Sequence, residues 1–288
     1  MKGVWSEKER YYRVFFPIVC PVLVQMVTQN GKIPLQNVII VPRYTINGST
    51  VMGKWASFYS CEELMAFAME KMPDYFQLGG IFQTVPTPEV REANKLGITT
   101  VKNPLIIDID MNDYDRTDVC DCGKEPKMCD KCYFALLIPA QKFLKHVLEK
   151  RYGFQKVLYV FSGKRGMHVW VLDDRVWTWT REQRQVFLDS ISSDAFSVKN
   201  DKYIMDDIFD NGNMKIFPKF DEAVTVDPCH LKKLPLMMHQ DTRNICILFP
   251  NLDSGFSFSM KQHCIRPNDM SDQEIRMFAE RIKYLVEL

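Results

Sequence analysis

The sequence predicts an α/β fold of the mixed α+β kind, because strand and helix patterns follow one another without regular βαβ units. The 288 residues are 46% hydrophobic and 25% charged, a composition that excludes a disordered, collagenous or coiled-coil chain. Two apolar segments between residues 157 and 172 have the spacing of a hairpin. No internal repeat or Gly/Ser linker divides the chain, so we expect a single domain over residues 1–288.

Residue type and periodicity predict the individual elements. Strands are expected over residues 38–41, 51–58, 105–110, 157–161 and 167–172. Helices are expected over residues 7–27, 60–72, 133–151, 180–190 and 271–288. Pro17 and Pro21 should break or bend the first helix. Ser60 and Ser271 each stand three positions before a Glu, which is the pattern of a capping box.

Charge and cysteine content limit the partners and the compartment. Lys and Arg number 37 and Asp and Glu 36, so the net charge of 37 − 36 = +1 indicates no overall polyanion-binding surface. A nucleic-acid site must therefore be built locally. The first ten residues lack the apolar core of a signal peptide, and no apolar stretch could span a bilayer. Nine Cys without a secretion signal favour a reducing, intracellular compartment.

Asp108 and Asp110 are the first candidate functional residues. Side chains at i and i+2 of a strand share a face, so the apolar strand 105–110 presents both carboxylates together. Adjacent carboxylates repel unless a cation lies between them, which favours a divalent metal site. The alternative is a strand end whose solvated acids lead into the polar loop 112–115.

Four of the nine cysteines are clustered as Cys120-x-Cys122-x6-Cys129-x2-Cys132. Four thiols this close together fit a tetrahedral structural zinc site. Four thiolates leave no open coordination position, so this metal would hold a loop and take no part in a reaction. The alternative is four unliganded thiols.

The segment 161–170 carries a glycine turn between two strands. Gly163 and Gly166 permit a tight turn with exposed backbone N–H groups. The polar side chains of this segment are Ser162, Lys164, Arg165 and His168. Together they suit a phosphate, although the glycine spacing is neither that of a Walker A loop nor that of a dinucleotide fingerprint. An ordinary basic hairpin is the alternative.

A fourth polar segment follows at 217–243. It contains Asp221, Asp227, His230, Lys232, Lys233, His239 and Arg243. On composition alone, Asp221 and Asp227 are equal candidates for a third carboxylate, and the two lysines could form a solvated face. Paired Asp, a third Asp and a basic turn are what metal-assisted nucleotidyl transfer requires, since two cations activate a hydroxyl and stabilise the leaving pyrophosphate.

In order along the chain, these motifs resemble those of the archaeo-eukaryotic DNA primases, catalytic (small) subunit, eukaryotic-type. Tyr11-Tyr-Arg-Val-Phe-Phe-Pro17 is similar to the family's N-terminal segment, and residues 105–115 are similar to its first catalytic motif. Ser162-Gly-Lys-Arg-Gly-Met-His168 matches the second motif, and Asp221 with residues 230–239 matches the third. The resemblance implies the primase catalytic core with a zinc-binding loop within 118–134. Since only residues 169–220 separate the second and third motifs, it implies little or no inserted helical subdomain, with a short helical insertion at about 175–212.

The resemblance also implies a role for each candidate. Asp108, Asp110 and Asp221 carry two catalytic Mg²⁺ or Mn²⁺ ions, the motif register favouring Asp221 over Asp227. The incoming nucleotide is bound by Arg43, Ser162, Gly163, Lys164, Arg165, His168, Lys233 and His239. Structural Zn²⁺ is bound by Cys120, Cys122, Cys129 and Cys132. Lys164 stands where many relatives have Arg, which keeps the charge and weakens planar bidentate contact.

The activity implied is that of a DNA primase, a nucleotidyltransferase that makes short RNA primers from nucleoside triphosphates on a single-stranded DNA template for replication. The implied partners are a large primase subunit and a replicative DNA polymerase, without a membrane. The implied place is the nucleus for a cellular eukaryotic protein, and otherwise an intracellular site such as a viral replication site. Two alternatives stay open: a primase-polymerase that uses deoxynucleotides in repair or damage bypass, and a non-catalytic zinc-dependent nucleic-acid-binding scaffold.

Overall fold

The structure is a computed structural model that describes residues 6–86, 102–114, 129–132, 136–198, 218–249 and 264–287. Helices and antiparallel sheets alternate along the chain, so the predicted mixed α+β class is confirmed. The first sheet has the strand order β2-β1-β3-β7, formed by β1 (Val38–Ile46), β2 (Ser49–Met52), β3 (Tyr75–Ile81) and β7 (Lys232–Lys233). The second has the order β4-β6-β5, formed by β4 (Leu105–Asp110), β5 (Val157–Phe161) and β6 (Gly166–Val171).

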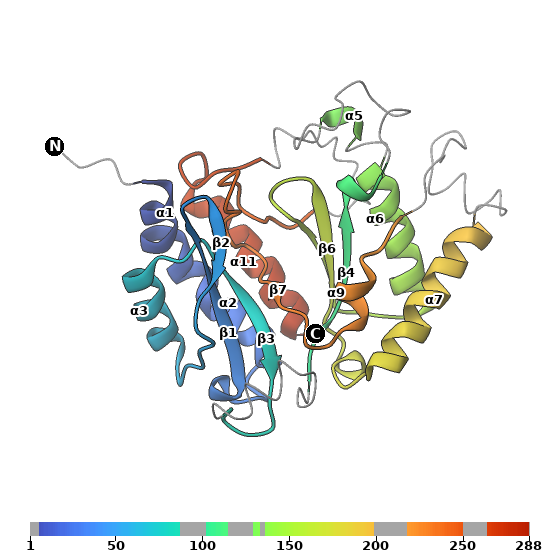
Figure 1. The fold of residues 1–288 in the computed structure, drawn as a ribbon, viewed down its shortest axis with the longest axis horizontal. Coiled ribbons are helices and arrows are strands. Elements are labelled where there is room, and N and C mark those ends of the chain that lie inside the picture. Colours follow the sequence, from blue (N-terminus) through green and yellow to red (C-terminus); the bar gives the residue numbers. More distant parts are fainter. Residues whose placement is uncertain are drawn as a thin grey trace.

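Helices cover the outer sides of the two sheets (Figure 1). Beside the first sheet are α1 (Glu7–Arg10), α2 (Phe16–Val27) and α3 (Cys61–Lys71), and beside the second are α6 (Ile138–Lys145) and α7 (Arg181–Val198). The C-terminal helix α11 (Asp272–Glu287) contacts both α2 and β5 and so joins the two halves. Shorter helical segments are α5 (Asp130–Cys132), α9 (Glu222–Val226) and the 3-10 turns Leu35–Asn37, Met111–Asp113 and Asp174–Val176.

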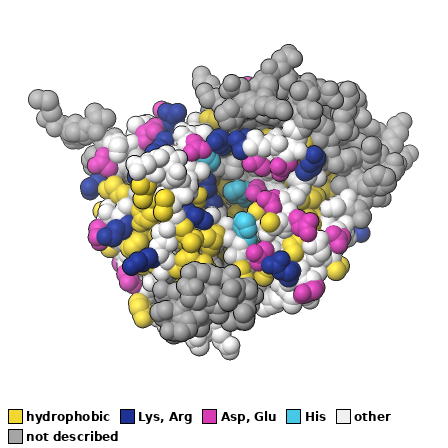
Figure 2. Space-filling model, in the orientation of Figure 1, with side chains coloured by type: hydrophobic (Ala, Val, Ile, Leu, Met, Phe, Trp, Pro, Cys, Tyr) yellow, Lys and Arg dark blue, Asp and Glu magenta, His cyan; other side chains and the backbone are white. Residues whose placement is uncertain are grey.

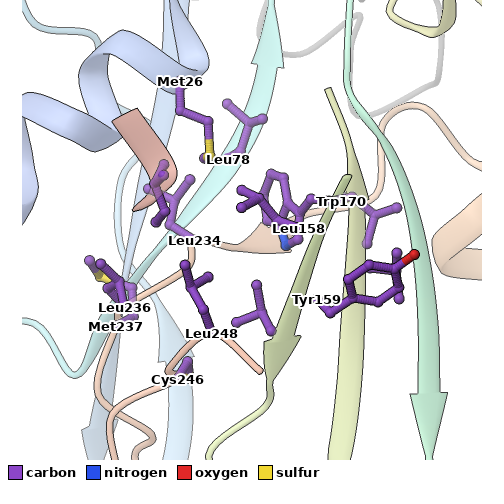
Figure 3. Packing of buried hydrophobic residues seen from close by; sticks show 14 of the residues in the cluster. Met26, Leu78, Leu158, Tyr159, Trp170, Leu234, Leu236, Met237, Cys246 and Leu248 are labelled. Carbon is purple, nitrogen blue, oxygen red and sulfur yellow. The ribbon is translucent and has the colours of Figure 1, made fainter. Parts of the chain in front are cut away.

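A hydrophobic core lies between the two sheets and extends under the helices. Met26 of α2, Leu78 of β3, and Leu158 and Trp170 of the second sheet lie side by side in it (Figure 3). These four side chains are between 0 and 3% exposed. Because one cluster of buried residues includes both sheets, the strands that carry the polar residues are fixed relative to one another.

The first helix is continuous where a break at proline was expected. A π-helical turn at Tyr11–Phe15 joins α1 to α2, and the Phe16 N–H donates to the Tyr11 carbonyl across it. Pro17 then follows this π-helical turn as the second residue of α2, and it has no N–H to donate to the preceding turn. Pro21 is inside α2, whose buried face packs against α3 and α11. Tertiary packing thus outweighs the local effect of Pro21.

Two element boundaries differ from the sequence prediction. The strand expected over 51–58 ends at Met52, and only an isolated bridge from Ala56 to Ile40 follows it. Gly53 marks the change, because a β-carbon there would approach Pro42 and Tyr44 to 2.8 Å. Helix α7 runs to Val198, beyond the expected end at residue 190. It occupies part of the predicted insertion at 175–212, of which residues 199–212 lie outside the described ranges.

The other predicted elements are present. Strands β4, β5 and β6 agree with the sequence prediction to within one residue, and β5 and β6 pair as the expected hairpin. The Ser60 side chain accepts from the Glu63 N–H at the start of α3. At the start of α11, Ser271 and Glu274 form the predicted capping box.

Candidate active site

The strand pair β4–β6 positions the first two carboxylates. Asp108 lies opposite His168 and Asp110 lies opposite Gly166 in the antiparallel register. The Asp108 Oδ1 atom is 3.6 Å from the His168 Nε2 atom. The alternation of the strand therefore directs both acids to one face, while the residues between and before them are buried.

Asp221 comes to the same place from a distant part of the chain. Its N–H donates to the Asp108 carbonyl at 3.0 Å, and its side chain caps α9 by accepting from the Val224 N–H at 3.2 Å. Asp227 instead forms an ion pair of 3.0 Å with Arg181. Of the two acids that composition could not separate, Asp221 is thus the one beside Asp108.

Burial and two neighbouring acids together raise the pKa of Asp108. Burial, together with the charges of Asp221 and Asp110, raises the pKa of Asp108 from 3.8 to about 7. Asp110 accepts from the Arg165 Nε at 2.9 Å and from the Asn112 N–H at 2.8 Å. Hard carboxylate oxygens with excess negative charge fit Mg²⁺ or Mn²⁺. In the described ranges, however, no three such side chains are already arranged as a metal site.

The turn Ser162–Gly166 joins β5 to β6 beside these acids. The Ser162 side chain accepts from the Gly166 N–H at 2.9 Å, and the Ser162 N–H donates to the Gly166 carbonyl at the same distance. Gly163 has φ +89°, and a β-carbon on it would lie 2.8 Å from the His239 β-carbon. This position therefore requires glycine for both its backbone angle and its close neighbour.

Cations and neutral imidazoles surround the turn. Lys164 forms an ion pair of 2.7 Å with Asp241, and the Lys233 ammonium lies 4.3 Å from the centre of the Tyr75 ring. Burial and nearby Lys233 lower the pKa of His168 to about 4 and that of His239 to about 3. At neutral pH both imidazoles are uncharged, so they offer hydrogen bonds and no charge.

One pocket of about 370 Å³ brings most of the predicted residues together. Its lining includes Asp108, Asp110, Ser162, Lys164, Arg165, His168, Lys233 and His239. Figure 2 shows the histidines near the middle of this face, with basic side chains on one side and acidic ones on the other. The buried Trp170 Nε1 in the pocket wall has no hydrogen-bond partner among the described residues.

Asp221 is not part of that lining and is joined to it by its backbone hydrogen bond to Asp108. Arg43 and Gly163 also lie just outside that lining. The Arg43 Nε donates to the Gln77 side-chain carbonyl, and Gln77 is part of the pocket wall. Gly163 contributes backbone to the turn below the pocket, where its carbonyl accepts from Asn244 and Thr242. Arg43 and Gly163 therefore border the pocket without lining it.

Sequence reasoning did not find three polar residues of the pocket wall. Gln77 is on β3 and belongs to no motif, so only the pairing of β3 with β7 brings it here. Gln240 and Asp241 directly follow His239, and their position next to a predicted site residue was the one available signal. Asp241 pairs with Lys164 and reduces the positive charge of the basic turn.

The described residues include half of the predicted zinc ligands. The Cys132 N–H donates to the Cys129 Sγ at 3.5 Å, next to the single turn of α5. Cys120 and Cys122 lie outside the described ranges. Zinc binding by the four cysteines remains a prediction.

Comparison with known proteins gives a consistent result. Residues 107–249 match the family model described as DNA primase small subunit. The chain is 32% identical over 139 residues to the DNA primase small subunit of Saccharomyces cerevisiae, which is 48% of this chain and 33% of that protein. It is 33% identical over 121 residues to the DNA primase small subunit of Schizosaccharomyces pombe, which is 42% of this chain and 26% of that protein. It is 39% identical over 77 residues to the DNA primase small subunit of Drosophila melanogaster, which is 27% of this chain and 17% of that protein. The matched stretches thus span a third or less of these relatives.

Proposed function

The match over residues 107–249 places this chain in the DNA primase small-subunit family, and from that premise we propose that it synthesises short RNA primers on single-stranded DNA for the initiation of replication. One observation carries the proposal: Asp108 and Asp110 line a pocket beside a basic glycine turn, and the backbone of Asp221, from a separate segment, is hydrogen-bonded to Asp108. Acids for cations next to cations for phosphates are the two requirements of nucleotidyl transfer.

Asp108, Asp110 and Asp221 would hold the catalytic Mg²⁺ or Mn²⁺ ions. Such ions, when bound, lower the pKa of the attacking 3′-hydroxyl and offset negative charge on the leaving pyrophosphate. The raised pKa of Asp108 is consistent with this assignment, because it reflects burial first and then the negative charges of Asp221 and Asp110, which a bound cation would offset. Asp110 would have to release Arg165 to take part.

Arg165 is then free to bind phosphate. Its planar guanidinium suits two phosphate oxygens, and Lys164 adds a second cation on the same turn. Neutral His168 and His239 can donate hydrogen bonds to phosphate oxygens. The His168 Nε2 atom also lies 3.6 Å from the Asp108 Oδ1 atom, which is longer than a hydrogen bond.

We propose a structural Zn²⁺ at Cys120, Cys122, Cys129 and Cys132, which would fix the loop that follows β4. A large primase subunit and a replicative DNA polymerase are the proposed partners, and the nucleus is the proposed place for a cellular eukaryotic protein. Across the described helices, none combines the length and apolar character that a membrane crossing needs.

The test is primer synthesis on unprimed single-stranded DNA with labelled ribonucleotides and Mg²⁺ or Mn²⁺. We expect short ribonucleotide products that disappear in Asp108→Ala. Products made only from deoxynucleotides would instead favour the primase-polymerase. A chain that binds single-stranded DNA and does not bind nucleoside triphosphate would contradict both enzymes and leave the nucleic-acid-binding scaffold.

A further inference from the structure

We infer that Asp74 is a positioning residue for the nucleotide site, acting through Arg243 on the turn that carries His239. The inference rests on the proposed function. Asp74 does not line the pocket, and we assign it a role in holding residues that do.

Asp74 is a buried carboxylate that two cations share. It is 1% exposed, and its Oδ1 atom is 2.6 Å from the Lys8 Nζ and 3.1 Å from the Arg243 Nη1. Burial alone would raise the pKa of Asp74, but the hydrogen bonds from Lys8, Thr45 and Arg243 lower it below its ordinary value. The Asp74 N–H also donates to the Arg43 carbonyl at 2.7 Å. An ionised, well-anchored carboxylate is therefore available to hold Arg243.

Arg243 connects this carboxylate to the turn 239–244. Its N–H donates to the His239 carbonyl at 2.9 Å, and its φ is +62°. A residue with a β-carbon rarely adopts this left-handed conformation, so the surroundings must hold it there. The ion pair with Asp74 fixes the Arg243 side chain, and through it the backbone of the turn.

The turn 239–244 in turn holds the Ser162–Gly166 turn. The Thr242 Oγ1 and the Asn244 Nδ2 both donate to the Gly163 carbonyl, at 2.7 and 2.9 Å. His239 also packs directly against Gly163, because a β-carbon on Gly163 would lie 2.8 Å from the His239 β-carbon. A shift of the turn 239–244 therefore displaces His239 and the phosphate-binding backbone together.

Lys8 supplies a matched control. It pairs with the same oxygen of Asp74, but it belongs to α1, and among the described residues its ion pair is with Asp74 and not with either turn. In a variant without Lys8, Arg243 still has Asp74 as its ion-pair partner. That variant therefore tests only the contribution of the buried Asp74 carboxylate to stability. Arg243→Gly supplies the complementary test, because glycine accepts φ +62° without strain and removes the guanidinium.

The experiment compares wild type, Asp74→Asn, Arg243→Gly and Lys8→Met. Calorimetry gives the Kd for Mg²⁺-ATP, extension of an annealed primer gives kcat, and thermal melting confirms folding. We expect Asp74→Asn and Arg243→Gly to raise the Kd about tenfold with kcat within about twofold, the pattern of lost ground-state positioning. Lys8→Met should bind ATP as the wild type does, whatever its melting temperature.

Two results would overturn the inference. One is an unchanged Kd in Arg243→Gly, which would make the ion pair irrelevant to the turn. The other is the same Kd in Asp74→Asn as in Lys8→Met, which would reduce Asp74 to a structural role. A wild-type chain that does not bind ATP would remove the proposed function and this inference together, so the two failures are distinguishable.

Discussion

Asp108 shows how burial and neighbouring charge act on a single carboxyl group. Its strand position places it between His168 on the paired strand and Asp221 at the cap of α9. The sequence alone predicted that Asp108 and Asp110 share a face, because that follows from the strand period. It could not predict the pKa of about 7, which depends on the third acid arriving from another segment.

The raised pKa of Asp108 predicts a dependence of stability on pH. Between its ordinary pKa of 3.8 and about 7, the folded protein binds a proton that the unfolded chain releases. The free energy of unfolding therefore falls as pH rises through this window and is level above it. Asp108→Asn cannot ionise, so it should exceed wild type in stability at pH 8 by on the order of 1–3 kcal/mol, with a smaller advantage at pH 5.

Urea unfolding of both proteins at the two pH values, with a chelator present, measures the difference. The exposed Asp189 gives a control, since Asp189→Asn should keep the pH dependence of wild type. Parallel stability curves for wild type and Asp108→Asn would contradict the shifted pKa.

Gly163 gives a second prediction at the residue scale. Gly163→Ala should lower the free energy of unfolding by about 1–3 kcal/mol, because it combines a left-handed φ with a close approach to His239. Gly153 has φ +64° with no neighbour within 4 Å of a β-carbon, so Gly153→Ala measures the backbone strain alone. Only Gly163→Ala should also weaken ATP binding. Equal effects of the two variants on binding would show that the contact with His239 is unimportant.

Among the elements, those with strong local signals were the ones that the sequence predicted well. Strands β4, β5 and β6 are apolar and bounded by turn residues, and the Ser60 cap and the Ser271 capping box mark two helix starts. At Ser60 the predicted box is incomplete, because the Glu63 side chain accepts from the Tyr59 N–H instead. The misplaced features depend on contacts outside the segment. Strand β2 ends just before Gly53, which packs closely against Pro42 and Tyr44, and α2 continues through Pro21 where it packs against α3 and α11.

Helix α11 carries the prediction at the element scale, since it joins α2 to β5. Ile282 is fully buried in this contact, whereas Met277 on the same helix is 61% exposed. Ile282→Ala should lower the free energy of unfolding by about 2–4 kcal/mol, and Met277→Ala should change it by less than about 0.5 kcal/mol. Chemical denaturation measures both. A small loss for Ile282→Ala would mean that α11 does not fix the two sheets together.

At the scale of the whole molecule, the site is an assembly of distant segments in a nearly neutral chain. The net charge is +1, yet the pocket concentrates Lys164, Arg165 and Lys233 together with Asp108 and Asp110. Motif order and the family resemblance predicted which segments meet. The contributions of Gln77, Gln240 and Asp241 could not be predicted, because they depend on sheet pairing and on a turn without a motif of its own.

The proposed zinc site is also tested on the whole chain. Elemental analysis of the purified protein should find about one Zn²⁺ per chain if the four cysteines form a closed site. Cys129→Ser should lose the metal and Cys229→Ser, which changes a cysteine outside the cluster, should keep it. Wild-type protein without stoichiometric zinc would contradict the site.

Primer extension by Asp221→Asn and Asp227→Asn, beside wild type, tests the central claim most directly. The claim is that Asp221, held against Asp108 by a backbone hydrogen bond, completes the carboxylate set beside the basic turn. With an annealed primer, ribonucleotides and Mg²⁺ or Mn²⁺, wild type and Asp227→Asn should extend at similar rates. Asp221→Asn should be slower by about a hundredfold or more, as expected for loss of a ligand used in the transition state. A wild-type rate in Asp221→Asn, or an equal loss in Asp227→Asn, would contradict this account of the site.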